Sequence, residues 1–126
     1  MSLTRDETIL TIRPEIQAID LSKSLSISEF FQNETLRPIL KYQNDIIQSL
    51  FLQKSKAPQL ALLDIADQRH RISKILESNT VLRNQLIGLV IALMTNKELE
   101  SYYEMEAEIK RRIKTMLVER LISKSS

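Results

Sequence analysis

The segment from Phe31 to Asp45 gathers the polar side chains of this chain that are best placed to bind a ligand. Asn33 and Gln43 fall on or beside a stripe of apolar residues, and Arg37 follows Asn33 at the four-residue spacing of a helix. A buried amide costs free energy unless it is hydrogen-bonded. The pattern therefore predicts either an internal polar network or a pocket.

Pro38 lies inside this segment and gives a reason to prefer the polar network. It lacks the backbone N–H that would hydrogen-bond a carbonyl near Glu34, so a neighbouring donor should replace it. We favour a polar network that stabilises a kink at Pro38 and fixes the register of the helix. The alternative is a small-ligand site, binding or catalytic, lined by Asn33, Arg37, Gln43 and Asn44.

Other familiar kinds of site lack the residues that they require. The chain has no cysteine, and its one histidine, His70, stands between Arg69 and Arg71, whose charges disfavour a bound metal. No serine is flanked by glycine in the manner of a catalytic nucleophile, and the single glycine, Gly88, excludes Walker and Rossmann phosphate loops. We therefore expect no metal, no cofactor and a non-enzymatic protein.

The charge balance disfavours nucleic acid as a partner. With 18 basic and 16 acidic residues the net charge is +2, so the overall field of the protein is weak. Arg69, His70, Arg71 and Lys74 form a local basic cluster, but no aromatic platform or recognition helix accompanies it. Weak nucleic-acid binding is the third of our hypotheses.

The composition predicts an all-α fold. Gly88 is the only glycine and Pro14, Pro38 and Pro58 are the only prolines, whereas the tight turns of sheets depend on such residues. Leu, Ile, Lys, Glu and Gln are abundant, and they are good helix formers or core residues. We expect one domain over residues 1–126, because the chain is too short for two ordinary domains.

Capping boxes mark the starts of three helices. In each, a hydroxyl side chain and a glutamate three residues later satisfy each other's free amides. The three pairs are Thr4 and Glu7, Ser26 and Glu29, and Thr95 and Glu98. The predicted bundle has four to five helices, at about 5–13, 28–54 with a kink at Pro38, 58–77 with a break at Asp64, 80–94 and 96–123.

The fourth predicted helix is apolar nearly all round. Such a helix is normally surrounded, by its own bundle or by a second subunit. Gly88 is unfavourable inside a helix, and close approach of a neighbouring helix would account for it. We therefore expect either a central core helix or a homodimer interface at Leu86, Gly88, Leu89, Val90 and Leu93.

No segment predicts a membrane span or a secretory signal. The most apolar run, Leu86 to Met94, is far shorter than the ~20 residues that a spanning helix requires. The first residues show no basic region followed by an apolar run. Together with the lack of cysteine, these features lead us to expect a cytoplasmic protein.

Three motifs resemble a family of small uncharacterised helical bacterial proteins. They are Ile-Arg-Pro-Glu at Ile12 to Glu15, Phe-Gln-Asn-x-x-Leu-Arg-Pro-Ile-Leu-Lys-x-Gln-Asn-Asp at Phe31 to Asp45, and Glu-Arg-Leu at Glu119 to Leu121. The resemblance covers most of the chain and implies an all-helical fold. Some members carry a glyoxalase label, but such chemistry uses a metal held by histidine and glutamate in a mostly β framework, which this sequence does not support.

The sequence therefore favours a helical bundle that acts by binding another protein or its own copy. The apolar fourth helix and the scarcity of catalytic groups support that hypothesis. A ligand-binding bundle built around Arg37 is the alternative, and a solvent-connected cavity beside Arg37 would favour it.

Overall fold

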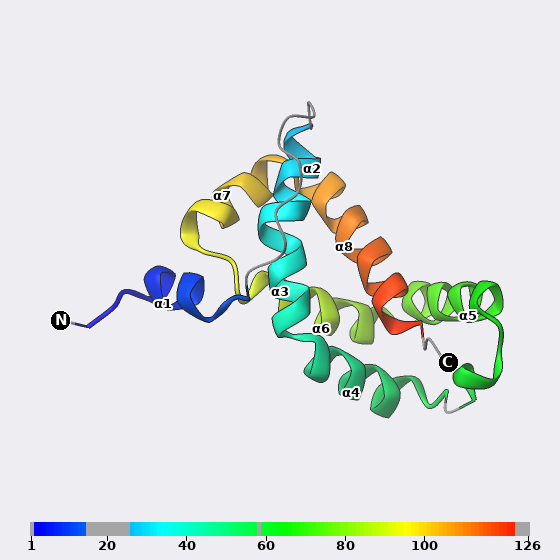
Figure 1. Cartoon of the computed structure of the whole chain (residues 1–126). Helices are drawn as coiled ribbons and strands as arrows, with labels where there is room; N and C mark the ends of the chain where they lie inside the picture. Colours follow the sequence, from blue (N-terminus) through cyan, green and yellow to red (C-terminus); the bar gives the residue numbers. More distant parts are fainter. Residues whose placement is uncertain (1, 15–25, 58, 123–126) are drawn as a thin grey trace.

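The computed structural model describes residues 2–14, 26–57 and 59–122, and these residues form helices and connecting turns without a strand (Figure 1). The helical elements are α1 (Arg5–Ile12), α2 (Ile27–Phe31), the π-helical turn η1 (Gln32–Leu36), α3 (Arg37–Tyr42), α4 (Asn44–Ser55), the 3₁₀ turn η2 (Leu60–Leu62), α5 (Ile65–Ser78), α6 (Thr80–Ile91), α7 (Asn96–Glu104) and α8 (Glu106–Leu121). The all-α prediction is confirmed for this part of the chain.

The predicted number of four to five helices is wrong. Because α2, η1 and α3 follow one another without a break, the described residues contain seven helices. Two of the predicted helices are each divided, one at Gln43 (φ −87°, ψ 2°) and one at Met105 (φ −130°, ψ 32°). Neither position is a glycine or a proline, so the sequence carries no local signal for these breaks.

The predicted caps mark the helix starts correctly. Thr4 and Thr95 form complete capping boxes with Glu7 and Glu98 at the starts of α1 and α7. Ser26 accepts a hydrogen bond from the backbone N–H of Glu29, which caps α2, but the return bond from Glu29 that would complete the predicted box is not formed between these described residues. Asp64 caps α5 and Asn79 caps α6 in the same way, each accepting from a backbone N–H three residues later.

The helix around Pro38 contains a π-helical turn. The backbone N–H of Arg37 donates to the carbonyl of Gln32, five residues earlier, in the turn that precedes Pro38. A kink at Pro38 itself stays a prediction. A plain change of direction lies farther along, at Gln43, where α4 leaves at an angle to α3 (Figure 1).

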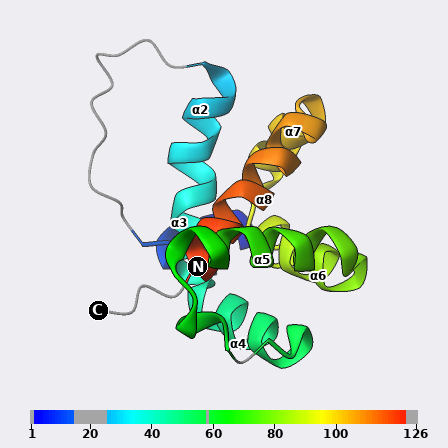
Figure 2. The ribbon, with the colours of Figure 1, turned by 90° about the vertical axis from the view of Figure 1, so that its right-hand side faces the viewer.

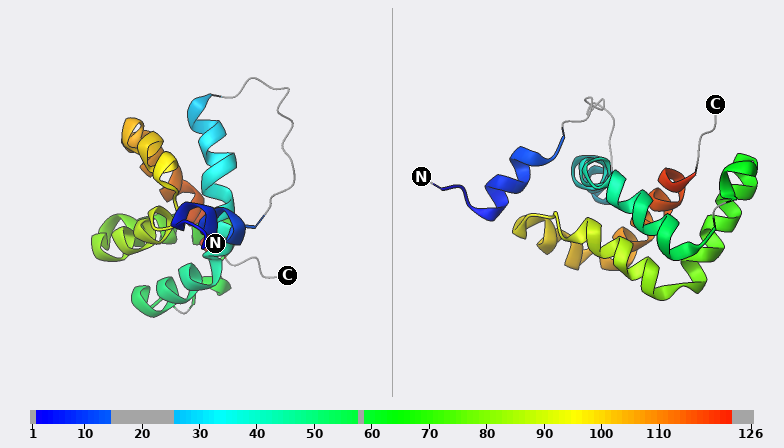
Figure 3. Two further views of the ribbon diagram at one scale, coloured as in Figure 1. Left: turned by 90° about the vertical axis from the view of Figure 1, so that its left-hand side faces the viewer. Right: turned by 90° about the horizontal axis from the view of Figure 1, so that it is seen from below.

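Helix α6 is the central helix of the core. It packs against α4, α5 and α8, and two views show it between α4 on one side and α7 and α8 on the other (Figures 2 and 3). Leu86 and Val90 are fully buried, while Leu89 and Leu93 are half-buried against the core. The apolar circumference of α6 is therefore largely covered within one chain, and an interface at these residues stays a prediction.

The surroundings of Gly88 differ from the expected close approach of a neighbouring helix to α6. Gly88 lies exposed, and a Cβ atom placed on it would meet no described atom within 4 Å beyond its chain neighbours and the nearby backbone of its own helix. No helix of the described chain approaches it closely, so the close-packing explanation is wrong for the single chain. A glycine inside a helix costs about 1 kcal/mol relative to alanine, and the fold leaves this cost unexplained.

The carboxylate of Glu98 joins three helical elements that are distant in sequence. Arg13, which follows α1, donates from Nη1 to Oε1 at 2.6 Å and from Nη2 to Oε2 at 2.9 Å. Thr35 of η1 donates from Oγ1 to Oε2 at 2.8 Å. The backbone N–H of Thr95, at the start of α7, donates to Oε1 at 2.9 Å. We call these four residues the Glu98 network.

Arginine side chains also attach α1 to the end of α6. Arg5 donates to the carbonyls of Ala92 at 2.7 Å and Met94 at 3.1 Å, and Arg13 donates to that of Leu93 at 3.3 Å. These three carbonyls belong to the C-cap of α6 and the turn after it, where the helical hydrogen-bond pattern has ended, and the guanidinium groups supply donors to them. Ile9 is the one buried apolar residue of α1, which means that polar contacts provide much of its attachment.

The pKa of Glu98 reflects this environment. Burial alone would raise the pKa of its carboxyl group. The hydrogen bonds from Arg13, from the Thr95 backbone and from Thr35, with the positive charge of Arg13, outweigh burial and hold the pKa below its ordinary value of 4.5. Glu98 is therefore ionised at neutral pH.

Replacing Glu98 with Gln should destabilise the fold strongly. The Arg13 side chain is 7% exposed and would lose the carboxylate that neutralises it, so we expect the free energy of unfolding to fall by about 2–4 kcal/mol. Urea denaturation followed by circular dichroism measures the change. Glu106→Gln is the matched control, because its ion pair with Lys110 is half exposed and should matter little. Equal losses in the two variants would contradict a special role for Glu98.

The same network predicts a loss of stability in acid. Because the folded chain holds the pKa of Glu98 below 4.5, the unfolded chain takes up the proton first as the pH falls. The contribution of Glu98 is therefore complete above its ordinary pKa and disappears as the pH falls through its folded pKa. Urea midpoints of the native protein and Glu98→Gln, compared from about pH 7 to about pH 3, should converge at the acid end. A constant difference would count against this assignment.

Candidate anion-binding site

A cavity of about 660 Å³ opens beside Arg37, between η1, α3, α4 and α8. Leu40 and Met116 provide apolar wall, whereas most of the other lining groups are polar. The polar lining residues are Gln32, Arg37, Asn44, Gln48, Thr115, Glu119 and Arg120. We call this cavity the Arg37 pocket.

Two arginines in the Arg37 pocket have no acidic partner in the part of the chain that the structure describes. Arg37 is exposed and forms no hydrogen bond or ion pair with any described residue. Arg120 is half-buried, and Asn44 Oδ1 lies 3.4 Å from its Nη1. Burial lowers the pKa of the Arg120 guanidinium, and the positive charge of Arg37 lowers it further. The carboxylate of Glu119 also lines the pocket, but it holds the guanidinium of Arg69 at 2.6 and 2.9 Å.

Amide side chains fix the geometry around these charges. Gln48 Nε2 donates to the carbonyl of Arg120 at 2.8 Å and lies 3.4 Å from Asn44 Oδ1, which ties α4 to the end of α8. Gln32 Oε1 accepts from Arg112 Nη1 at 2.8 Å, which ties η1 to α8. That bond leaves the Nε2 group of Gln32 without an acceptor among the described residues, so it can donate to a ligand.

The structure brings together two of the four predicted site residues. Arg37 and Asn44 line the same pocket. Gln43 instead donates to the carbonyl of Leu89 at 3.0 Å and fastens the junction of α3 and α4 to α6. Asn33 is half-buried and does not line the pocket.

Sequence reasoning missed Gln32, Gln48 and Arg120. Gln48 could have been found, because it follows Asn44 by four residues and therefore shares a face of one helix with it. Arg120 had no such signal, since it comes from the far end of the chain. It also belongs to the basic end of the last helix, where the helix dipole alone explains a positive charge.

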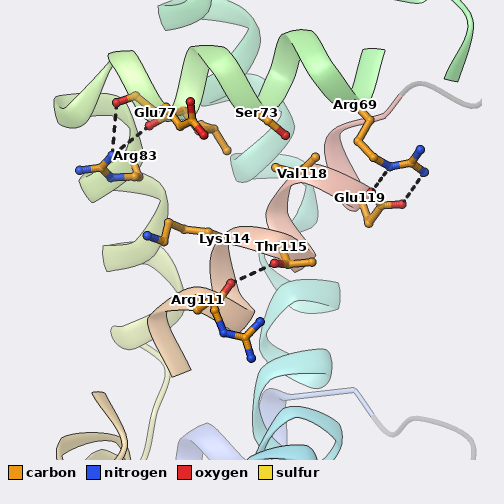
Figure 4. Close-up of a pocket in the computed structure, with 10 residues that line it drawn as sticks. Arg69, Ser73, Glu77, Arg83, Arg111, Lys114, Thr115, Val118 and Glu119 are labelled. Carbon is orange, nitrogen blue, oxygen red and sulfur yellow. Dashed lines mark hydrogen bonds and ion pairs between the residues drawn. The ribbon is translucent and has the colours of Figure 1, made fainter. Parts of the chain in front are cut away.

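A second cavity, of about 340 Å³, lies between α5 and α8 (Figure 4). The arginines that line it already have hydrogen-bond or ion-pair partners. Arg83 donates to the carbonyls of Leu76 at 3.3 Å and Glu77 at 3.4 Å, while Arg69 and Arg111 pair with Glu119 and Glu108. Arg69 belongs to the basic cluster of the sequence, so part of that cluster is neutralised. The Arg37 pocket is consequently the stronger candidate for binding an anion.

Other classes of site find little support in the described residues. Nowhere in residues 2–14, 26–57 and 59–122 do three or more His, Cys, Asp or Glu side chains gather to hold a metal ion. None of the helices in this part of the chain is long and apolar enough to cross a membrane. Comparison with protein-family models, with curated proteins and with solved structures gives no match.

Replacing Arg37 with Gln should leave the fold intact. The change removes one of two nearby like charges and breaks no hydrogen bond or ion pair between described residues, so the free energy of unfolding should stay within about 0.5 kcal/mol of the native value or rise. Arg13→Gln is the matched comparison and should cost several times as much, because it breaks the Glu98 network. Urea denaturation of both variants measures this. Equal losses would mean that Arg37 has a structural role.

Proposed function

We propose that this protein binds a small dianionic ligand, a phosphate or dicarboxylate, in the Arg37 pocket. The observation that carries the proposal is the pair Arg37 and Arg120, which share one cavity without an acidic partner among the described residues. Like charges brought together and partly desolvated are unfavourable, and a bound anion would relieve both effects.

The shape and lining of the pocket suit such a ligand. Arginine presents a planar fork of donors that matches carboxylate and phosphate oxygens, often through two parallel hydrogen bonds. Gln32 and Asn44 add amide groups that can orient the rest of the ligand. A volume of about 660 Å³ falls within the range typical of small-molecule sites.

The lining favours binding over catalysis. Glu119 is the one carboxylate among the described lining residues, and its ion pair with Arg69 makes it a poor general base. His70 lies on the exposed surface of α5 and does not line the pocket. We therefore propose a binding protein that senses or carries an anion.

The hypothesis of a self-associating or partner-binding bundle has less support from this fold. That hypothesis depended on the apolar surface of α6. In the structure, α4, α5 and α8 cover most of this surface. The cavity beside Arg37, in contrast, is the feature that the ligand hypothesis requires. Anion binding is therefore the function we put forward.

Isothermal titration calorimetry with succinate and with inorganic phosphate tests the proposal. Arg37→Gln and Arg120→Gln should each weaken binding of the preferred anion at least about tenfold, because each removes a charged hydrogen-bond donor. Arg71→Gln is the matched control, since it removes the same charge from the exposed surface of α5, outside the pocket.

Three outcomes would contradict the proposal. One is that neither anion binds the native protein, and another is that both pocket variants bind as the native protein does. The third is an equal loss in Arg71→Gln, which would point to a general charge effect. Circular dichroism of each variant confirms that it is folded before it is titrated.

A further inference from the structure

A third cavity, a groove of about 450 Å³, runs beside Gly88 between α6, α7 and the start of α8. Ile87, Ile91 and Leu99 give it apolar walls. It shares no lining residue with the Arg37 pocket. We call it the Gly88 groove.

Gly88 is an unexplained feature of this groove. Its φ angle is not positive, so its backbone conformation does not call for glycine. The space where a side chain would project is open, so packing within the described chain does not call for glycine either. What the absence of a side chain does provide is room against the backbone of α6, inside a cavity.

Tyr102 also lines the groove, and its side chain is 2% exposed. Its buried hydroxyl group has no hydrogen bond of normal geometry with a described residue, but the side chains of Glu106 and Lys110 interact with it. Because the hydroxyl group is closed off from solvent, a ligand in the open groove does not reach it. Tyr102 therefore counts as part of the wall and not as a polar contact for a ligand.

The rim of the groove is positively charged. Arg83, Lys110 and Lys114 line it, against the single carboxylate of Glu106 among the described lining residues. Glu106 pairs with Lys110 at 3.2 Å, and Arg83 donates to the carbonyls of Leu76 and Glu77. Lys114 forms no ion pair with any described residue, so it is the cation that a ligand would meet. An apolar floor under a cationic rim is complementary to a molecule with an apolar body and a negative head.

We propose that the Gly88 groove binds a carboxylate with an apolar tail, such as a medium-chain fatty acid. The tail lies against the backbone at Gly88 and between Ile87, Ile91 and Leu99, and the carboxylate faces Lys114. This site is independent of the proposed function, because it uses other residues on another face of the fold.

A second copy of the chain fits this groove less well. A two-fold symmetric contact places the same patch of both copies together. It would bring Arg83, Lys110 and Lys114 of one copy toward the same cations of the other, which is unfavourable. A small anion meets no such repulsion.

Calorimetric titration with octanoate, below its micelle-forming concentration, tests the inference. Gly88→Leu should weaken octanoate binding at least about tenfold by filling the groove. Gly88→Ala should weaken it too, yet raise the urea midpoint, because alanine is the better helix former. Gln85→Leu is the matched control, since it adds the same side chain at an exposed position of α6 outside the groove, and it should bind octanoate normally.

Further titrations test whether the carboxylate and the apolar tail of octanoate each contribute to binding. Octylammonium and acetate should bind far more weakly than octanoate, and Lys114→Gln should weaken octanoate binding about threefold or more. Arg37→Gln should leave octanoate binding unchanged, which distinguishes this site from the Arg37 pocket.

Native-like octanoate binding by Gly88→Leu, or equal binding of octylammonium, would overturn the inference. So would sedimentation showing a dimer that Gly88→Leu dissociates, because that result would assign the groove to a second copy.

Discussion

The ionised carboxylate of Glu98 is the constraint that fixes α1 and η1 to the start of α7. Its four hydrogen bonds come from the end of α1, from η1 and from the start of α7, which are separate in sequence. Thr35 lies two residues before Arg37, so the carboxylate also anchors the helix that carries Arg37. Gln32, through Arg112, anchors the same turn to α8. The candidate site therefore stands on a segment that is fixed at two points.

Three arginines that the fold holds at helix ends differ from the two that line the Arg37 pocket. Arg5, Arg13 and Arg83 donate to carbonyls at the ends of helices, and Arg13 also has a buried carboxylate. Such groups are accounted for by the fold. Arg37 and Arg120 are different, because they share a cavity and have no carboxylate partner among the described residues. This contrast, rather than net charge, is the reason to look for an anion in that cavity.

The sequence predicted those features that depend on neighbouring residues. Helix starts at Thr4 and Thr95 were predictable because a capping box is complete within four residues. The breaks at Gln43 and Met105 were not, because neither position carries a glycine or proline that would signal a break.

The residues of the candidate site were likewise predictable only where they are neighbours in the sequence. Arg37 and Asn44 were found because they lie in one polar run, but Arg120 joins them only after α8 folds back across the bundle. Asn33 and Gln43 belong to the same polar run, but they do not line the pocket.

The most direct test of anion binding is a titration of ¹⁵N-labelled protein with the preferred anion, followed through the side-chain amide resonances of Gln32, Asn44 and Gln48. We expect these resonances to shift and saturate together while that of Asn84, outside the pocket, stays in place. No shift, or shifts of equal size at Asn84, would contradict the account.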